Sequence, residues 1–181
     1  MTTPVQIAQY DLESLVESFF RETEGNWRSE RRYYTLKSGE VEEVISDIAI
    51  AFLEKGSTEL VQLAQKHELA DTSALVCGSQ VSWISNYSKP GRKPVTGSTV
   101  FGVRENILFR DRGFATSKPV AAEYFMRELK TMHLHTEYGG STYEEEIKLI
   151  GSNYRTRQTI ISRAGEEIMI GQYLERRVMS S

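Results

Sequence analysis

The chain has 181 residues and a formal net charge of −3, and 39% of its residues are hydrophobic. This length predicts one domain, which we place over residues 1–181. The acidic balance argues against nucleic acid as the main partner, and no window approaches the roughly 20 apolar residues of a membrane span. The first residues show no basic region followed by an apolar core, so we expect no secretory signal.

Cys77 is the only cysteine of the chain. A single cysteine excludes an intramolecular disulfide and a cysteine-rich zinc site, and it favours a reducing compartment. No histidine is near it in sequence and the chain has no Gly-x-Ser-x-Gly motif, so we interpret Cys77 as a buried structural thiol. Nucleophilic catalysis by the chain's own side chains is therefore not expected.

Two segments have the spacing of amphipathic helices. In the first, at about residues 11–22, apolar residues between 12 and 20 form one stripe. The second covers residues 58–68 and follows Gly56-Ser57. We expect the first helix to cover or plug one end of a barrel.

The remaining segments read as short strands separated by turn signals such as Ser38-Gly39 and Gly139-Gly140. The expected strands cover residues 25–36, 42–53, 74–85, 97–103, 107–114, 119–127, 131–138, 141–150, 153–163 and 167–178. About ten short strands in up-and-down order favour a closed antiparallel barrel, because closure removes the exposed edges of a long meander. The predicted fold class is all-β, with a lipocalin-like barrel.

The segment from Tyr154 to Arg163 has the most informative pattern. Alternation along a strand places one set of side chains on a shared face, namely Arg155, Arg157, Thr159, Ile161 and Arg163. Neither face is cleanly apolar, which is unusual for a strand with one side in a hydrophobic core. Arginines on the inner face of a barrel predict a wet interior that accepts an anion.

Other residues carry two interpretations each. Glu145 shares a face with Ile147 and Leu149, so it either points inward, with a pKa raised by desolvation, or belongs to a solvated acidic strand start. Trp27 and Trp83 offer flat surfaces for a planar ligand, although core packing also explains buried tryptophans.

His133, His135 and Glu137 alternate on one strand and could ligate a metal or form a solvated face. A solvated face is the commoner reason for such a stripe, so we expect no metal.

Five sequence blocks, in this order, resemble those of the S/U-type (CpcS/CpeS-like) phycobiliprotein lyases. The resemblance extends from about Phe19 to Val178, and the blocks read WRSER (27–31), GSTVFG (97–102), FRDRGF (109–114), YRTRQT (154–159) and GQYLE (171–175). It implies a ten-stranded barrel related to fatty-acid-binding proteins, which binds a free phycobilin such as phycocyanobilin or phycoerythrobilin. It also implies transfer of the bilin to a cysteine of an apo-phycobiliprotein subunit through a thioether bond, without a cofactor.

The resemblance also implies residue roles. Arg31 and Arg157, with Arg155 as an equally defensible match, would bind the bilin propionates. The pocket carboxylate falls on residues 144–146, with Glu145 favoured by its face, and it would hold a proton at a pyrrole nitrogen. The pocket tryptophan falls on Trp83.

One position departs from the S-type pattern, because Tyr33-Tyr34 stands where those members carry a histidine. Tyr34 is therefore expected to donate a hydrogen bond to the ligand but not to titrate near neutrality. Trp27, in the first block, is the remaining ligand-binding candidate.

The alternatives are a carrier of bilins or lipids without transfer activity, or one partner of a heteromeric lyase. A homodimer, or a heterodimer with an S-type lyase, would fit such roles. The expected compartment is the cyanobacterial cytoplasm or the plastid stroma.

Overall fold

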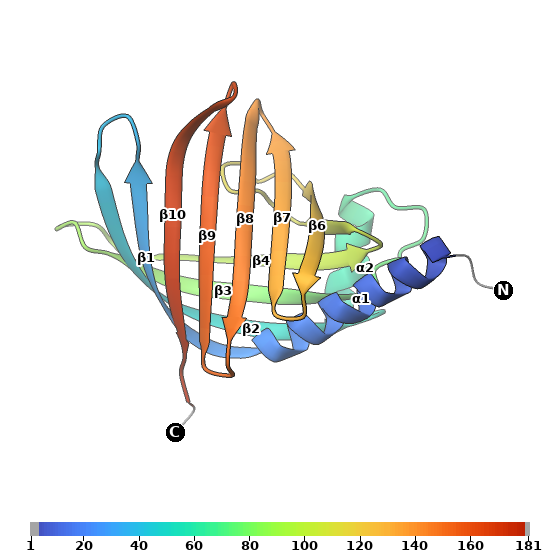
Figure 1. The fold of residues 1–181 in the computed structure, drawn as a ribbon. Helices are drawn as coiled ribbons and strands as arrows, with labels where there is room; N and C mark the ends of the chain where they lie inside the picture. Colours follow the sequence, from blue (N-terminus) through green and yellow to red (C-terminus); the bar gives the residue numbers. More distant parts are fainter. Residues whose placement is uncertain (1–3, 180–181) are drawn as a thin grey trace.

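The strands of this protein close on themselves into an antiparallel barrel (Figure 1). The computed structural model describes residues 4–179, and the side chains of residues 12–179. The helices are α1 (Pro4–Thr23) and α2 (Thr58–Lys66), and the strands are β1 (Gly25–Thr35), β2 (Val41–Glu54), β3 (Cys77–Tyr87), β4 (Val95–Arg104), β5 (Ile107–Arg110), β6 (Val120–Glu128), β7 (Thr131–Tyr138), β8 (Ser141–Ile150), β9 (Tyr154–Arg163) and β10 (Glu166–Arg177). Each strand pairs with its neighbours in sequence, and β1 pairs with β10 to close the barrel. The predicted all-β barrel is confirmed.

The two predicted helices are present with different bounds. α1 begins at Pro4 rather than near residue 11, and proline suits a first turn because its fixed φ is helical and its missing N–H is not needed there. α2 begins after Ser57, whose side chain accepts a hydrogen bond from the backbone N–H of Leu60. It ends at Lys66, two residues before the predicted end.

The prediction of a strand through residue 114 is wrong, because β5 ends at Arg110. The next residue, Asp111, accepts hydrogen bonds from Thr99 Oγ1 at 2.7 Å and from the N–H of Val100 at 3.1 Å. These side-chain contacts hold Asp111 against β4 at the point where the regular backbone pairing of β5 with β4 ends. Residues 111–119 then cross to β6 as an irregular segment, which we call the β5–β6 segment.

One end of the barrel is closed by α1 (Figure 1). Val16, Phe19 and Phe20 of this helix are buried in the main hydrophobic cluster. Trp27, at the start of β1, belongs to the same cluster. The prediction that the first helix covers a barrel end is therefore confirmed, and the apolar core lies at this end.

α2 packs against the outside of the barrel at β4. Leu60, Leu63 and Ala64 of the helix are buried there together with Leu75. A Cβ on Gly102 of β4 would lie 2.7 Å from Leu75 Cδ1 and 3.0 Å from Leu60 Cδ2, so this close approach requires glycine.

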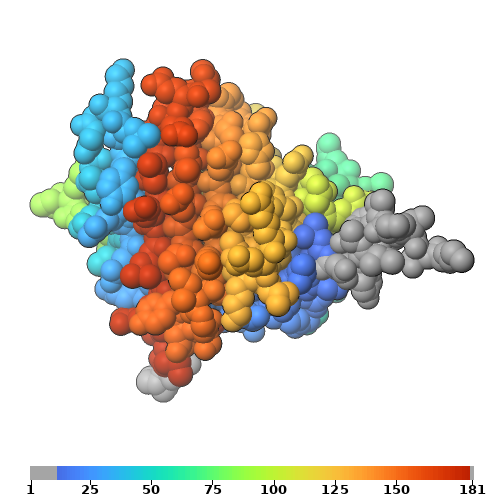
Figure 2. Space-filling view, viewed as in Figure 1, coloured from blue at the N-terminus to red at the C-terminus, as the bar shows by residue number. Residues whose placement is uncertain are grey.

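The opposite end of the barrel is formed by hairpin tips. The β1–β2 and β9–β10 hairpins stand next to each other there, away from α1 (Figures 1 and 2). None of the helices in the described part of the chain has the length and apolar character that crossing a membrane would require.

Candidate functional site

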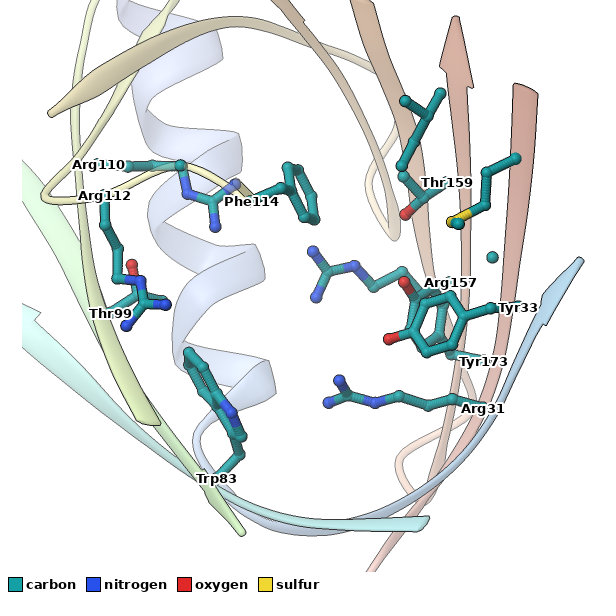
Figure 3. A pocket seen from close by; sticks show the side chains of 14 residues that line it. Arg31, Tyr33, Trp83, Thr99, Arg110, Arg112, Phe114, Arg157, Thr159 and Tyr173 are labelled. Carbon is teal, nitrogen blue, oxygen red and sulfur yellow. The ribbon is translucent and has the colours of Figure 1, made fainter. Parts of the chain in front are cut away.

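A cavity of about 180 Å³ lies inside the barrel toward the hairpin end (Figure 3). Its wall combines arginines, aromatic rings and small residues from several strands. The lining residues are Arg31, Tyr33, Trp83, Thr99, Arg110, Arg112, Gly113, Phe114, Arg157, Thr159, Ile161, Met169, Gly171 and Tyr173. Four arginines thus line the interior of the barrel at this level.

Strand register places Arg31, Tyr173 and Arg157 side by side on one wall. Tyr173 of β10 pairs with Arg31 of β1 on one side and with Arg157 of β9 on the other. Both guanidinium carbons lie near its ring, at 5.3 and 5.5 Å from the centroid. Tyr33 meets the same ring edge-on, with the centroids 5.8 Å apart. The wall is therefore a continuous cationic and aromatic surface.

Arg157 reaches diagonally to Glu145 of β8, and its Nη2 donates to Glu145 Oε1 at 2.5 Å. The Glu145 side chain is only 1% exposed, which places it on the inner face rather than in a solvated strand start. Burial lowers the pKa of Arg157, but attraction to the carboxylate of Glu145 outweighs it and leaves the pKa raised. The second carboxylate oxygen, Oε2, is buried and has no hydrogen-bond partner among the described residues.

Trp83 stands on the opposite wall (Figure 3). Its ring lies across Gly97, its direct partner on β4, where a Cβ would approach Trp83 Cζ2 to 2.4 Å. Arg112 of the β5–β6 segment lies over the same ring at 5.8 Å from the centroid. Glycine at position 97 is thus what lets the indole lie flat against the wall.

Arg110 also belongs to this second wall. Its guanidinium carbon lies 4.9 Å from the ring centroid of Phe101 and 4.8 Å from that of Phe114. The Phe114 ring is in turn stacked on Tyr143, with 5.0 Å between the centroids. The residue is 7% exposed, and burial lowers the pKa of its guanidinium.

Arg155 lies one step below the cavity. It pairs with Glu175 of β10, and its Nε donates to Glu175 Oε1 at 2.8 Å, with side-chain exposures of 8% and 1%. Burial alone raises the pKa of Glu175, but the charge of Arg155 outweighs it and leaves the pKa lowered. Ser29 of β1 pairs with Glu175 across the strands, and its Oγ accepts a hydrogen bond from Arg31 Nε at 3.1 Å. A buried polar layer thus supports the cavity floor.

The family model for CpeS-like protein matches residues 15–178 of the chain. The chain belongs to the CpeS-like family. The resemblance seen in the sequence is confirmed.

Individual relatives agree with this membership. A Nostoc sp. protein provisionally named phycocyanobilin lyase CpcS 2 is 58% identical over 167 residues, covering 92% of this chain and 93% of its own. The phycocyanobilin lyase subunit CpcS of Picosynechococcus sp. is 30% identical, covering 91% and 87%. The solved structure of the S-type phycobiliprotein lyase CPES from Guillardia theta superposes with a TM-score of 0.78 at 26% identity, covering 92% of this chain and 94% of that chain.

Three of the residues proposed for ligand binding do not line the cavity of this CpeS-like protein. Trp27 is 1% exposed at the closed end, where its Nε1 donates to the carbonyl of Thr23 and Arg177 lies over its ring. Tyr34 is on the outer face, because it alternates with the inward Tyr33. Arg155 is held by Glu175. The cavity is therefore not lined by these three residues, and their part in ligand binding stays a prediction from the sequence.

Four further residues line the cavity without having been predicted from sequence, namely Arg110, Arg112, Phe114 and Tyr173. A signal for three of them was present. Residues 110, 112 and 114 occupy alternate positions and would share one face of an extended segment. No such pattern marks Tyr173, whose place depends on its pairing with β1 and β9.

The histidine stripe is on the outer face of β7. His135 Nε2 lies 3.0 Å from Glu137 Oε1, and His133 is stacked on Phe125. Within the described residues, no group of three or more His, Cys, Asp or Glu side chains could hold a metal ion. Cys77 is 1% exposed, and burial raises its pKa to about 12, so its thiol is a poor nucleophile.

Proposed function

We propose that this protein binds a linear tetrapyrrole, phycocyanobilin or phycoerythrobilin, and attaches it to a cysteine of a phycobiliprotein subunit. The charge of the cavity carries the proposal. Four arginines line the cavity and contribute four positive charges. Two carboxylates offset two of these charges: Glu145, which is paired with Arg157, and Asp111, which is hydrogen-bonded to Thr99 in the cavity wall. Two positive charges are left over, which matches the two propionates of a bilin.

The shape of the cavity supports a conjugated ligand that is not fully enclosed. Trp83, Tyr173 and Phe114 offer ring surfaces on both walls. A cavity of about 180 Å³ is smaller than the roughly 300–1,000 Å³ of pockets that enclose a drug-sized ligand. A bilin would therefore be held by part of its length and extend through the hairpin end, where an acceptor protein can reach it.

The chemistry requires no nucleophile from this chain. The S–H of the acceptor cysteine adds across the ethylidene double bond of the bilin: sulfur bonds to the outer carbon, and the ring carbon gains the proton. Glu145 is the residue that we assign to proton control at a pyrrole nitrogen. A propionate that engages Arg157 would release the Glu145 carboxylate toward the ligand, and Glu145 Oε2, which has no partner among the described residues, is available for this.

A reconstitution assay tests the proposal. The purified protein, phycocyanobilin and an apo-phycobiliprotein subunit are incubated, and covalent product is detected on a zinc-stained denaturing gel. We expect a fluorescent subunit band that depends on the protein. Bilin uptake without any covalent product, even when an S-type lyase is added, would replace lyase activity with a carrier role.

The same assay tests whether this protein acts alone or together with a second lyase subunit. Activity with this chain alone would agree with a monomer or homodimer, whereas activity only after mixing would identify a heteromeric lyase. Its free, buried cysteine suits a reducing compartment, and we extend the proposal to the cyanobacterial cytoplasm or the plastid stroma.

A further inference from the structure

Arg110 is a buried cation that points into the cavity from the wall opposite Arg31 and Arg157 (Figure 3). It extends from the end of β5, and rings of Phe101 and Phe114 flank its guanidinium. Its Nε is sealed from solvent and has no hydrogen-bond partner among the described residues. The group is therefore held in place by packing rather than by a counterion.

The other deeply buried arginines of the barrel do have counterions. Arg157 is bound to Glu145, and Arg155 is bound to Glu175. For Arg110, Glu145 acts only as a distant attraction, and no described carboxylate lies within salt-bridge distance. Burying a charge without a partner is costly, so a protein that retains one commonly uses it to bind something.

A second arginine stands beside it. Arg112 lines the same wall at its exposed rim, over the ring of Trp83. Asp111, between the two, points to β4 and accepts hydrogen bonds from Thr99 and Val100. This anchoring fixes the backbone from which both arginines project toward the cavity.

We propose that Arg110, with Arg112 beside it, forms a second carboxylate-binding subsite, distinct from the one at Arg31 and Arg157. Resting on the proposed function, this assigns one bilin propionate to each wall. It also explains why Arg155 is not needed as a ligand residue, since its charge is already matched below the cavity floor. A planar ligand bridged in this way would lie between Trp83 and Tyr173.

The test combines a variant with a change in the ligand. Arg110→Met should weaken uptake of phycocyanobilin about 10- to 100-fold, the loss expected for one charge-assisted hydrogen-bonded contact. A second ligand is the monomethyl ester of phycocyanobilin in which the propionate of this subsite is esterified and carries no charge. Arg110→Met should bind phycocyanobilin, with both propionates free, no more tightly than it binds this monoester, because the substitution and the esterification remove the same contact. Arg32→Met, an exposed outer-face variant, is the matched control and should bind like wild type.

Folding is monitored in parallel. Because no carboxylate of the described residues forms a salt bridge with Arg110, Arg110→Met should melt at the wild-type temperature or above it. Arg110→Lys, which keeps the charge, should retain most of the affinity for phycocyanobilin. The subsite would be overturned if Arg110→Met bound phycocyanobilin as tightly as the wild type does. It would also be overturned if Arg110→Met lost affinity equally for phycocyanobilin and for its dimethyl ester.

A second pair of ligands distinguishes failure of bilin binding from failure of the Arg110 subsite. If wild type binds no phycocyanobilin, cis-parinaric acid and its methyl ester serve as probes. A loss of the acid but not of the ester in Arg110→Met would support the subsite while the bilin function fails. Equal binding of the acid by wild type and by Arg110→Met would reject the subsite as well.

Discussion

The buried pair Arg155–Glu175 is expected to stabilise the barrel rather than to bind ligand. Replacing Arg155 with methionine leaves Glu175 as an unpaired charge in the interior, at a cost of about 3–5 kcal/mol. Solvent cannot screen this charge, because the two side chains are 8% and 1% exposed and bonded at 2.8 Å. At about 2–4 °C per kcal/mol for a protein of this size, the melting temperature should fall by roughly 6–20 °C.

The double variant Arg155→Met/Glu175→Leu provides the comparison. It removes both charges, so it should recover most of the stability lost in the single variant. Urea unfolding at pH 7, followed by far-UV circular dichroism, measures the free energies of unfolding, with Arg32→Met as a surface control. The reasoning is refuted if Arg155→Met is as stable as wild type, or if the double variant is no more stable than the single one. Retained phycocyanobilin uptake by a folded double variant would exclude Arg155 as a ligand residue.

The same pair predicts a pH dependence. The folded-state pKa of Glu175 is lowered from its ordinary value of 4.5. Its contribution to stability is therefore fully present above about pH 4.5 and is lost as the pH falls through the folded-state pKa. Wild type should lose stability on acidification below pH 4.5, and the double variant should lose less. If the free energy of unfolding fell equally with pH in the two proteins below pH 4.5, this assignment would be contradicted.

Three further substitutions test the site. Glu145→Gln should slow transfer to the acceptor about 100-fold or more in the zinc-gel assay while phycocyanobilin affinity stays nearly constant; equal losses would indicate a structural role. Gly97→Ala should displace the Trp83 ring and weaken bilin uptake in an absorbance titration by about 2- to 10-fold, and unchanged affinity would remove Trp83 from the ligand contacts. Cys77→Ala should leave the amount of covalent product unchanged, because the buried thiol takes no part in the reaction; loss of product from a folded variant would contradict this.

The strand faces could be predicted because alternation is a local property of an extended chain. Alternation placed Arg155 and Arg157 on one shared face, and both point inward. For Glu145 it left an inward and a solvated position open, and the structure shows the inward one. The barrel itself followed from the number of short strands and the turns between them. Neither inference required knowledge of which strands become neighbours.

What each inward residue touches was decided by the tertiary structure. Register among β8, β9, β10 and β1 sets the height of each side chain along the barrel, so Arg157 meets Glu145 at the cavity while Arg155 meets Glu175 below it. At the end of β5, Asp111 forms hydrogen bonds to Thr99 and Val100 across the β4–β5 hairpin, a side-chain contact that strand alternation does not reveal. By itself the sequence determined a barrel with arginines inside. The counterion that each arginine receives, and the absence of one at Arg110 among the described residues, come from strand pairing over distances that no local pattern encodes.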